Sequence, residues 1–199
     1  MTARPRTVGP DAGPEPPYPY RMEGQVISGF GRGSKELGIP TANLPVDNAL
    51  TPWIAQIPSG VYFGYASLLL PPSHPDALPT LSPSTSTSDS TSPSDPPFQV
   101  YPMVMSIGYN PFYKNTLRSA EVHILHSFAQ DFYHRPMRLL ICGFIREEKD
   151  YDSLDALVAD IRFDCDVARD SLARNGWEWP VVGGEDAARW LVGPLPSGQ

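Results

Sequence analysis

The chain has 199 residues, of which 41% are hydrophobic and 19% are charged, and its formal net charge is -7. This length and apolar content suit one domain with a single core. The acidic balance disfavours a nucleic-acid-binding protein, which ordinarily carries a basic surface.

The first segment, residues 1–17, is rich in Pro and Gly and has no hydrophobic period. Such a segment buries too little apolar surface to offset its chain entropy, so we expect a disordered arm. It has no apolar stretch typical of a secretory signal, and no apolar run in the chain reaches the ~20 residues that span a membrane. We therefore expect an intracellular, cytoplasmic protein without a membrane span.

Alternation of apolar and polar residues predicts strands in 22–30, 59–70, 101–110 and 119–128, and a nearly continuous apolar run predicts a buried strand in 137–145. Residues 71–97 are nearly all Pro, Ser, Thr and Asp, which predicts a low-complexity insertion between two paired strands. In the second of these strands, Val61, Phe63 and Tyr65 share one face, and Gly64 indicates a bulge.

Hydrophobic residues at helical spacing predict a helix over 152–175, followed by a Gly- and Pro-containing tail over 176–199. Trp177, Trp179 and Trp190 would dock this tail on the rest of the domain. Strands first and a helix last are typical of an antiparallel β-barrel with a C-terminal helix, not of a doubly wound α/β fold. The main domain is expected over 18–175.

Both cysteines, Cys142 and Cys165, fall inside apolar segments. The pattern indicates buried free thiols in a reducing compartment, with a single disulfide as the alternative.

The segment GFGRGSKELGIPTANLP, residues 29–45, combines the alternating glycines Gly29, Gly31 and Gly33 with Lys35. It matches neither the P-loop pattern nor the dinucleotide-binding fingerprint. Glycines let backbone N–H groups approach an anion closely, and a lysine adds positive charge. The segment is therefore interpreted either as a phosphate-binding loop or as a tight structural turn.

Thr41 and Asn43 follow this loop and are two residues apart, so in an extended chain their side chains point to the same side. A hydroxyl and an amide carbonyl are neutral oxygen ligands, which suit Mg²⁺ when a nucleotide supplies the negative charge. The alternative is a local turn motif. The residues themselves do not distinguish Mg²⁺ from Zn²⁺ or Mn²⁺.

Glu121 lies in the middle of an apolar, alternating strand, where a glutamate is unusual unless it is paired or functional. It is either a member of a structural ion pair or a general base. His123 shares its side of the strand and either orients Glu121 or is a satisfied barrel histidine. His123 and His126 lie three residues apart on a strand, hence on opposite faces, which excludes a shared zinc ion.

The segments 24–45, 59–68, 103–128 and 131–157 together resemble the monofunctional eukaryotic riboflavin kinases, in the same order along the chain. The resemblance implies a six-stranded antiparallel β-barrel that binds ATP and riboflavin. Because a self-contained barrel needs no partner, we expect a monomer. It would transfer the γ-phosphate of ATP to the riboflavin 5′-hydroxyl and release ADP and FMN. A non-catalytic flavin or nucleotide carrier on the same barrel is the alternative.

For ATP, the resemblance implies two groups of contacts. The first is a flap over the phosphates, formed by Gly29, Gly31, Gly33 and Lys35. The second is a stretch that lines the adenine nucleotide, formed by Ile124, His126 and Tyr133.

For the chemistry, the resemblance implies that Thr41 and Asn43 contact Mg²⁺ and that Glu121 is the catalytic base. It places Arg146 and Lys149 in a loop that closes over the flavin. A carboxylate is well suited to accept the proton of a primary alcohol, which is otherwise a poor nucleophile.

Overall fold

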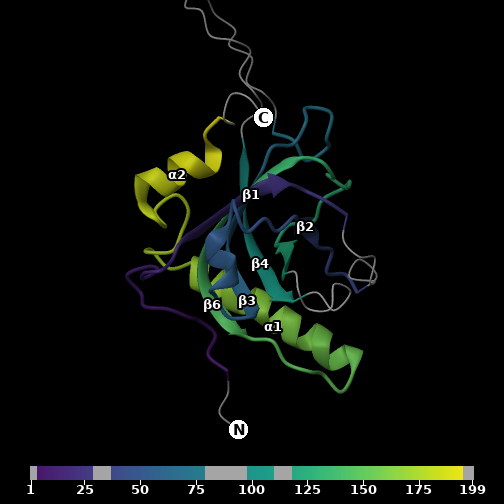
Figure 1. The fold of residues 1–199 in the computed structure, drawn as a ribbon, viewed down its shortest axis with the longest axis vertical. Helices are drawn as coiled ribbons and strands as arrows, with labels where there is room; N and C mark the ends of the chain where they lie inside the picture. The colour runs from purple at the N-terminus through teal and green to yellow at the C-terminus, as the bar shows by residue number, and fades with distance from the viewer. Residues whose placement is uncertain (1–3, 29–36, 79–97, 110–117, 195–199) are drawn as a thin grey trace, which may run out of the picture.

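The computed structural model describes residues 4–28, 37–78, 98–109 and 118–194 (Figure 1). The predicted flap residues Gly29, Gly31, Gly33 and Lys35 lie outside these ranges. So do residues 79–97, which form most of the predicted insertion.

Six strands form one sheet in the described residues, in the order β1-β6-β3-β4-β5-β2, and every neighbouring pair is antiparallel. Their bounds are β1 Tyr20–Gln25, β2 Ala42–Leu44, β3 Gly60–Leu68, β4 Gln99–Tyr109, β5 Arg118–Ile124 and β6 Pro136–Glu147. A short 3-10 helix, η1, spans Pro52–Ala55 between β2 and β3. The predicted mainly-β, six-stranded antiparallel fold is confirmed.

The sheet curls until its two edges approach each other. Just after β1, the Ile27 N–H donates to the Asn43 carbonyl in β2 over 2.9 Å, and the two residues form an isolated antiparallel bridge. This contact ties the first edge strand to the last and gives the sheet its half-barrel form.

The inner face of the curled sheet carries one apolar core, to which every strand contributes. Tyr62 and Leu68 of β3 alternate with Phe63 and Tyr65, which instead face outward. The predicted common face of Phe63 and Tyr65 is therefore confirmed. The β3–β6 register also shifts between Phe63 and Gly64, as expected for a bulge.

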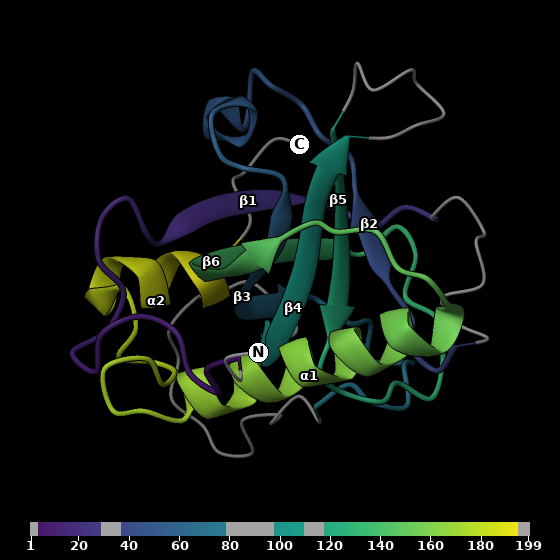
Figure 2. The same ribbon diagram turned by 90° about the horizontal axis from the view of Figure 1, so that it is seen from below.

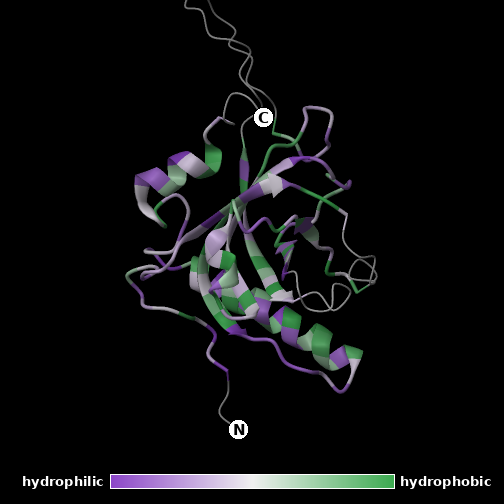
Figure 3. Cartoon of the chain, in the orientation of Figure 1, coloured by the Kyte–Doolittle hydropathy of each residue, from purple (hydrophilic) through white to green (hydrophobic). Residues whose placement is uncertain are grey.

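Two helices cover the outer face of the sheet, α1 (Leu154–Leu172) and α2 (Gly184–Val192) (Figure 2). Hydrophobic and hydrophilic residues alternate along α1 (Figure 3), and its apolar side includes Cys165, Ala168 and Leu172. The Ser153 hydroxyl caps α1 by accepting the Ala156 N–H over 3.2 Å. No helix in the described ranges has the length and apolar content needed to cross a membrane.

The C-terminal segment is more regular than the tail that its composition predicts, because α2 occupies its centre. Ser67 of β3 donates its hydroxyl to the Leu191 carbonyl over 2.7 Å and fixes this helix to the sheet. Trp177 is buried and stacks on Phe63 with ring centroids 5.5 Å apart. Docking of this segment through tryptophan is therefore confirmed.

Residues 4–17 also depart from expectation, because they lie along α1 instead of forming a loose arm. Arg6 pairs with Asp170 over 2.9 Å, and the Val8 N–H donates to the Ser171 hydroxyl over 3.1 Å. Polar side chains of α1, one acidic and one neutral, supply these partners, and the composition of the arm alone does not reveal them.

Cys142 and Cys165 are both buried and unpaired, which decides between the two alternatives in favour of free thiols. Burial raises the pKa of the Cys165 thiol to about 11, so it stays protonated at neutral pH.

The bulge at Gly64 yields a stability prediction. A Cβ atom at this position would lie 2.0 Å from the Leu140 carbonyl oxygen in β6. We expect Gly64→Ala to lower the free energy of unfolding by about 3 kcal/mol, because the backbone must shift to relieve the clash. Urea denaturation followed by circular dichroism measures this change.

Gly24→Ala is the matched control, because Gly24 also lies in a strand but its Cβ would make an ordinary 3.5 Å contact with Leu44. It should change the free energy of unfolding by no more than about 0.5 kcal/mol. Equal losses in the two variants would contradict the close approach at Gly64.

Candidate active site

One row of residues across the sheet carries several of the predicted site residues. Asn43 of β2 lies directly opposite Glu121 of β5, which lies opposite Ser106 of β4. Ser106 in turn pairs with Val61 of β3, and Val61 pairs with Arg146 of β6. Because directly opposed residues share a face of the sheet, these side chains project to the same side.

This row lies on the outer face of the sheet, away from the apolar core. Ala120 and Val122, which flank Glu121, are both buried in that core, so the Glu121 side chain points outward. Glu121 is half-buried, and Asn43 is only 6% exposed. Opposed Cβ atoms in such pairs are about 4.5–5.5 Å apart, so the carboxylate and the amide are neighbours.

A second carboxylate reaches the same row from the segment after β6. Glu148 Oε1 lies 3.5 Å from the hydroxyl of Ser106, the residue that pairs directly with Glu121. Gly108 makes room for it, since a Cβ there would lie 2.2 Å from Glu148 Oε1.

His123 fixes the chain that leads into Thr41. Its Nδ1 lies 2.9 Å from the Pro40 carbonyl oxygen, as expected for a donated hydrogen bond. Burial lowers the pKa of His123, so the neutral ring is favoured at neutral pH. Of the two alternatives, the structure supports a satisfied histidine, which positions Pro40 instead of orienting Glu121.

A cavity of about 450 Å³ opens beside β2 and β5. Its lining includes four of the predicted nucleotide and metal residues, namely Thr41, Ile124, His126 and Tyr133. Its size is in the range of small-molecule sites, which is about 300–1,000 Å³. Val26 and Pro40, described residues on either side of the glycine segment, also line it.

Sequence reasoning missed most of the loop that forms the far wall of this cavity. Phe128, Ala129, Gln130, Asp131 and Phe132 all line it, between His126 and Tyr133. The aromatic-rich run HSFAQDFYH at the end of a strand was the available signal, since aromatic side chains are common in ligand pockets. Phe128 packs edge-to-face on both His126 and Phe132, with centroids 4.7 and 4.6 Å apart.

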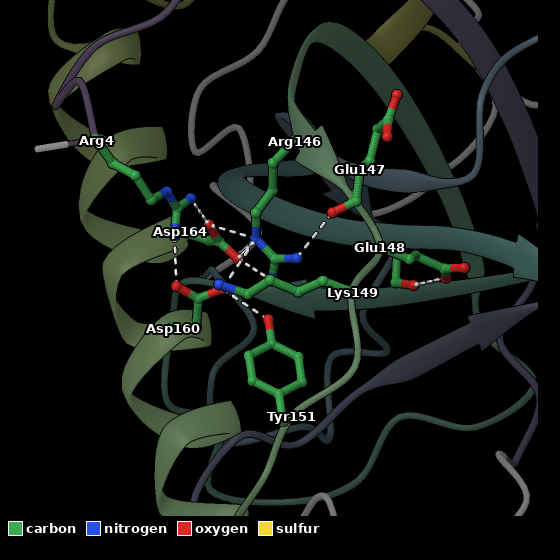
Figure 4. Close-up of polar contacts among 9 residues, drawn as sticks. Arg4, Arg146, Glu147, Glu148, Lys149, Tyr151, Asp160 and Asp164 are labelled. Carbon is green, nitrogen blue, oxygen red and sulfur yellow. Dashed lines mark hydrogen bonds and ion pairs between the residues drawn. The ribbon is translucent and has the colours of Figure 1, made fainter. Parts of the chain in front are cut away.

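Arg146 and Lys149, the two predicted flavin-loop residues, converge on acidic residues of α1 (Figure 4). Arg146 donates to Asp164 from Nη2 over 2.7 Å and from Nε over 3.0 Å. Lys149 Nζ lies 2.9 Å from Asp160, which also accepts the Tyr151 hydroxyl over 2.6 Å. These contacts hold the segment after β6 against the helix.

Arg4 joins the same cluster from the N-terminal segment and pairs with both Asp160 and Asp164. Three cations therefore face two carboxylates, and Glu147 and Glu148 extend from the same segment after Arg146. The Arg146 side chain is 15% exposed, whereas that of Lys149 is 50% exposed. Lys149 is thus better placed than Arg146 to contact a ligand.

The predicted residues therefore form three groups and not one. Thr41, Ile124, His126 and Tyr133 line the cavity, whose lining does not include Asn43 or Glu121. Asn43 and Glu121 are neighbours on the outer face, next to the cavity wall formed by Pro40, Thr41 and Ala42. Arg146 lies three strands from Glu121 on the same row, roughly 14 Å away at a strand spacing of about 4.8 Å.

Comparison with known proteins identifies the family of the chain. A sequence model of the riboflavin kinase family, also called flavokinase, matches residues 16–172. The chain belongs to the riboflavin kinase family. The riboflavin kinase of Pyricularia oryzae is 69% identical over 207 residues, with 98% of each chain covered.

Further members of the riboflavin kinase family show similar coverage. The riboflavin kinase of Chaetomium globosum is 69% identical over 189 residues, covering 87% of this chain and 80% of its own. That of Neurospora crassa is 54% identical over 229 residues, covering 95% and 96%. A crystal structure of the riboflavin kinase from Trypanosoma brucei aligns with a TM-score of 0.55 at 25% identity, covering 81% of this chain and 84% of that one.

The ion pairs of Asp160 with Arg4, Arg146 and Lys149 predict that the stability of this kinase depends on pH. Burial by itself raises the pKa of Asp160, but hydrogen bonds from Tyr151 and Lys149 and the nearby arginines outweigh burial and hold the pKa below its usual value. Asp160 then stabilises the fold fully above the pKa of an unfolded aspartate, about 3.9. This stabilisation is lost as the pH falls through the lower pKa of the folded state.

Asp160→Asn should therefore be less stable than the wild type at neutral pH, and the difference should shrink progressively below about pH 4. Thermal unfolding of both proteins between pH 2 and pH 7 measures it. Asp155→Asn, which changes an exposed carboxylate in the first turn of the same helix, is the control and should show no comparable change. A pH-independent difference for Asp160→Asn would contradict the ion pairing.

Proposed function

We propose that this enzyme transfers the γ-phosphate of ATP to the 5′-hydroxyl of riboflavin, with Glu121 as the general base. The observation that carries the proposal is the register of β2 and β5, which sets Asn43 directly opposite Glu121 beside the cavity. A carboxylate and an amide oxygen are thus neighbours at the edge of a pocket large enough for part of a nucleotide. The family relationship supports the same reaction.

Glu121 would accept the proton of the riboflavin 5′-hydroxyl. As the bond between that oxygen and the γ-phosphorus forms, the bond to the β–γ bridging oxygen breaks, and ADP leaves. The carboxylate is only half-buried, so part of it remains exposed for a substrate to contact. Phosphoryl transfer otherwise requires positioning and charge neutralisation, not covalent catalysis by the protein.

The nucleotide would lie in the cavity, with its base against Ile124, His126 and Tyr133 and its phosphates toward Thr41. Val26 and Pro40 both line this cavity. The chain therefore leaves and re-enters the described structure close to the cavity on either side of the glycine segment. This supports a flap over the phosphates that includes Gly29, Gly31, Gly33 and Lys35.

Riboflavin kinases generally need a divalent cation, and we propose Mg²⁺ held by Thr41 and Asn43. The donors fit a hard cation, because the Asn43 amide is buried, its neighbour Glu121 is a carboxylate, and all three side chains offer oxygen. In the described ranges, no group of three His, Cys, Asp or Glu side chains is arranged to hold a metal ion. Phosphate oxygens and water would therefore complete the shell, and the bound cation would neutralise charge on the phosphates.

Riboflavin would approach the row from the side of the segment after β6. The Lys149 side chain, which is 50% exposed, suits the polar edge of a flavin or the ribityl phosphate of the product. Arg146, which is fully engaged with Asp164, would shape this wall, and Lys149 would contact the ligand.

The general-base assignment is tested with Glu121→Gln, which keeps the shape of the side chain but removes its basicity. We expect kcat for FMN formation to fall by roughly 10²- to 10⁴-fold. The affinities for riboflavin and Mg-ADP should stay within about twofold, because the variant preserves the fold and the cavity. Chromatography with flavin fluorescence measures turnover, and isothermal titration calorimetry measures binding. A variant that retained near-normal kcat would rule out this role for Glu121.

The metal assignment is tested with Thr41→Ala. We expect its affinity for Mg-ADP to fall by roughly 10-fold while its affinity for metal-free ADP changes little, because a ligand to the cation is removed and not a contact to the nucleotide. Calorimetric titrations with and without Mg²⁺ give both constants. Equal losses in the two titrations would instead indicate that Thr41 shapes the cavity.

A further inference from the structure

Two residues at the start of the predicted insertion, His74 and Asp76, contact the loop that forms the far wall of the cavity. This loop, residues 126–133, follows β5 and supplies most of the aromatic side chains of the cavity lining. Neither His74 nor Asp76 lines the cavity itself. Their contacts with the loop therefore act on the cavity only through its wall.

Asp76 holds the middle of the loop with its carboxylate. Oδ2 accepts the Ala129 N–H over 2.9 Å. Oδ1 lies 3.8 Å from Nε2 of His126, too far for a hydrogen bond but near enough for electrostatic attraction to a protonated ring. One carboxylate thus faces two residues of the cavity lining.

His74 holds the next residue and also fixes Asp76. Its Nε2 lies 3.1 Å from the Gln130 carbonyl oxygen, and its Nδ1 accepts the Asp76 N–H over 3.1 Å. Because Nδ1 is an acceptor, the proton is on Nε2, which donates to Gln130. The His74 side chain is only 4% exposed, and its ring packs edge-to-face on Phe128.

Three consecutive residues of the cavity lining, Phe128, Ala129 and Gln130, are therefore held from outside by His74 and Asp76. Loops between strands are usually more mobile than the strands themselves. A loop that becomes ordered only when the ligand binds weakens the affinity by the entropy lost on ordering. A buried histidine and a hydrogen-bonded carboxylate remove much of that freedom before any ligand arrives.

We propose that His74 and Asp76 are positioning residues that preorganise the 126–133 loop and so set the affinity for the adenine nucleotide. The inference rests on the proposed function, in which that nucleotide occupies this cavity. It assigns to the first part of the insertion a role in substrate affinity and not in the phosphoryl-transfer step.

Asp76→Ala is the main test, because it removes the acceptor for the Ala129 N–H and the charge near His126. The KM for Mg-ATP and the dissociation constant of Mg-ADP should rise roughly 3- to 10-fold, the effect of losing about one hydrogen bond. The kcat and the KM for riboflavin should stay within about twofold, since neither the base nor the flavin side is touched. Steady-state kinetics and calorimetry measure these constants.

Two further variants separate positioning from general loss of structure. Asp76→Asn keeps an oxygen that can accept the Ala129 N–H, so its Mg-ADP affinity should lie within about threefold of the wild type. Asp47→Ala is the matched control, because Asp47 also accepts a backbone N–H, from Ala49 over 2.7 Å, in a loop that does not line the cavity. It should leave the Mg-ADP affinity unchanged.

The proposal is overturned if Asp76→Ala binds Mg-ADP as tightly as the wild type. It is also overturned if Asp47→Ala weakens binding equally, or if riboflavin affinity falls in parallel. Failure of the proposed function would look different, because the wild-type enzyme itself would then bind no Mg-ADP or form no FMN, and both proposals would fall together.

Discussion

The antiparallel register between β2 and β5 is the constraint on which the candidate site depends. β2 has three residues, and the burial of Ala42 and Leu44 in the core leaves Asn43 to point outward. A slip of one residue would turn Asn43 into the core and expose both apolar neighbours, so hydrophobic burial enforces the register. The bridge to Ile27 and the bond from His123 to Pro40 hold the same short strand from both sides.

In the proposed mechanism, the inner face of this strand pair contacts the nucleotide base and the outer face carries the reactive groups. On the inner side, Ala42, Val122 and Ile124 form part of the cavity wall, and apolar contact there suits a nucleotide base. On the outer side, Asn43 and Glu121 bring two oxygen-bearing side chains together. Thr41, which directly precedes β2, lies where the chain passes from the cavity to this outer row. The β2–β5 strand pair thus lies between the proposed binding site for the base and the side chains proposed to act in phosphoryl transfer.

Long-range contacts supply the rigidity that the row and the cavity need. Helix α1 packs on the outer face of the sheet and uses Asp160 and Asp164 to hold the segment after β6. Arg4 ties the N-terminal segment to the same two carboxylates. Neutralising these buried or half-buried aspartates matters because an unpaired carboxylate in such surroundings is costly.

By itself, the sequence determined five of the six strands, their inward and outward faces, and the residue types of the site, whereas β2 was not among the predicted strands. The alternation around Glu121 predicted a mid-strand carboxylate, because side chains alternate between the two faces of a strand. The shared side expected for Thr41 and Asn43 stays a prediction, since Thr41 lines the cavity and Asn43 does not. The resemblance then assigned their roles. Period-2 patterns also located β3, β4 and β5 to within a few residues, and a nearly continuous apolar run located β6.

Only the tertiary structure decided which segments distant in the sequence contact each other. It placed residues 4–17 along α1, formed α2 within a tail that looked irregular, and set Asp76 against Ala129, 53 positions away in the chain. Such contacts join segments whose own compositions show no preference for each other, so no local pattern announces them. They exist because folding brings a donor to an acceptor, or an apolar surface to its complement, once the sheet has curled.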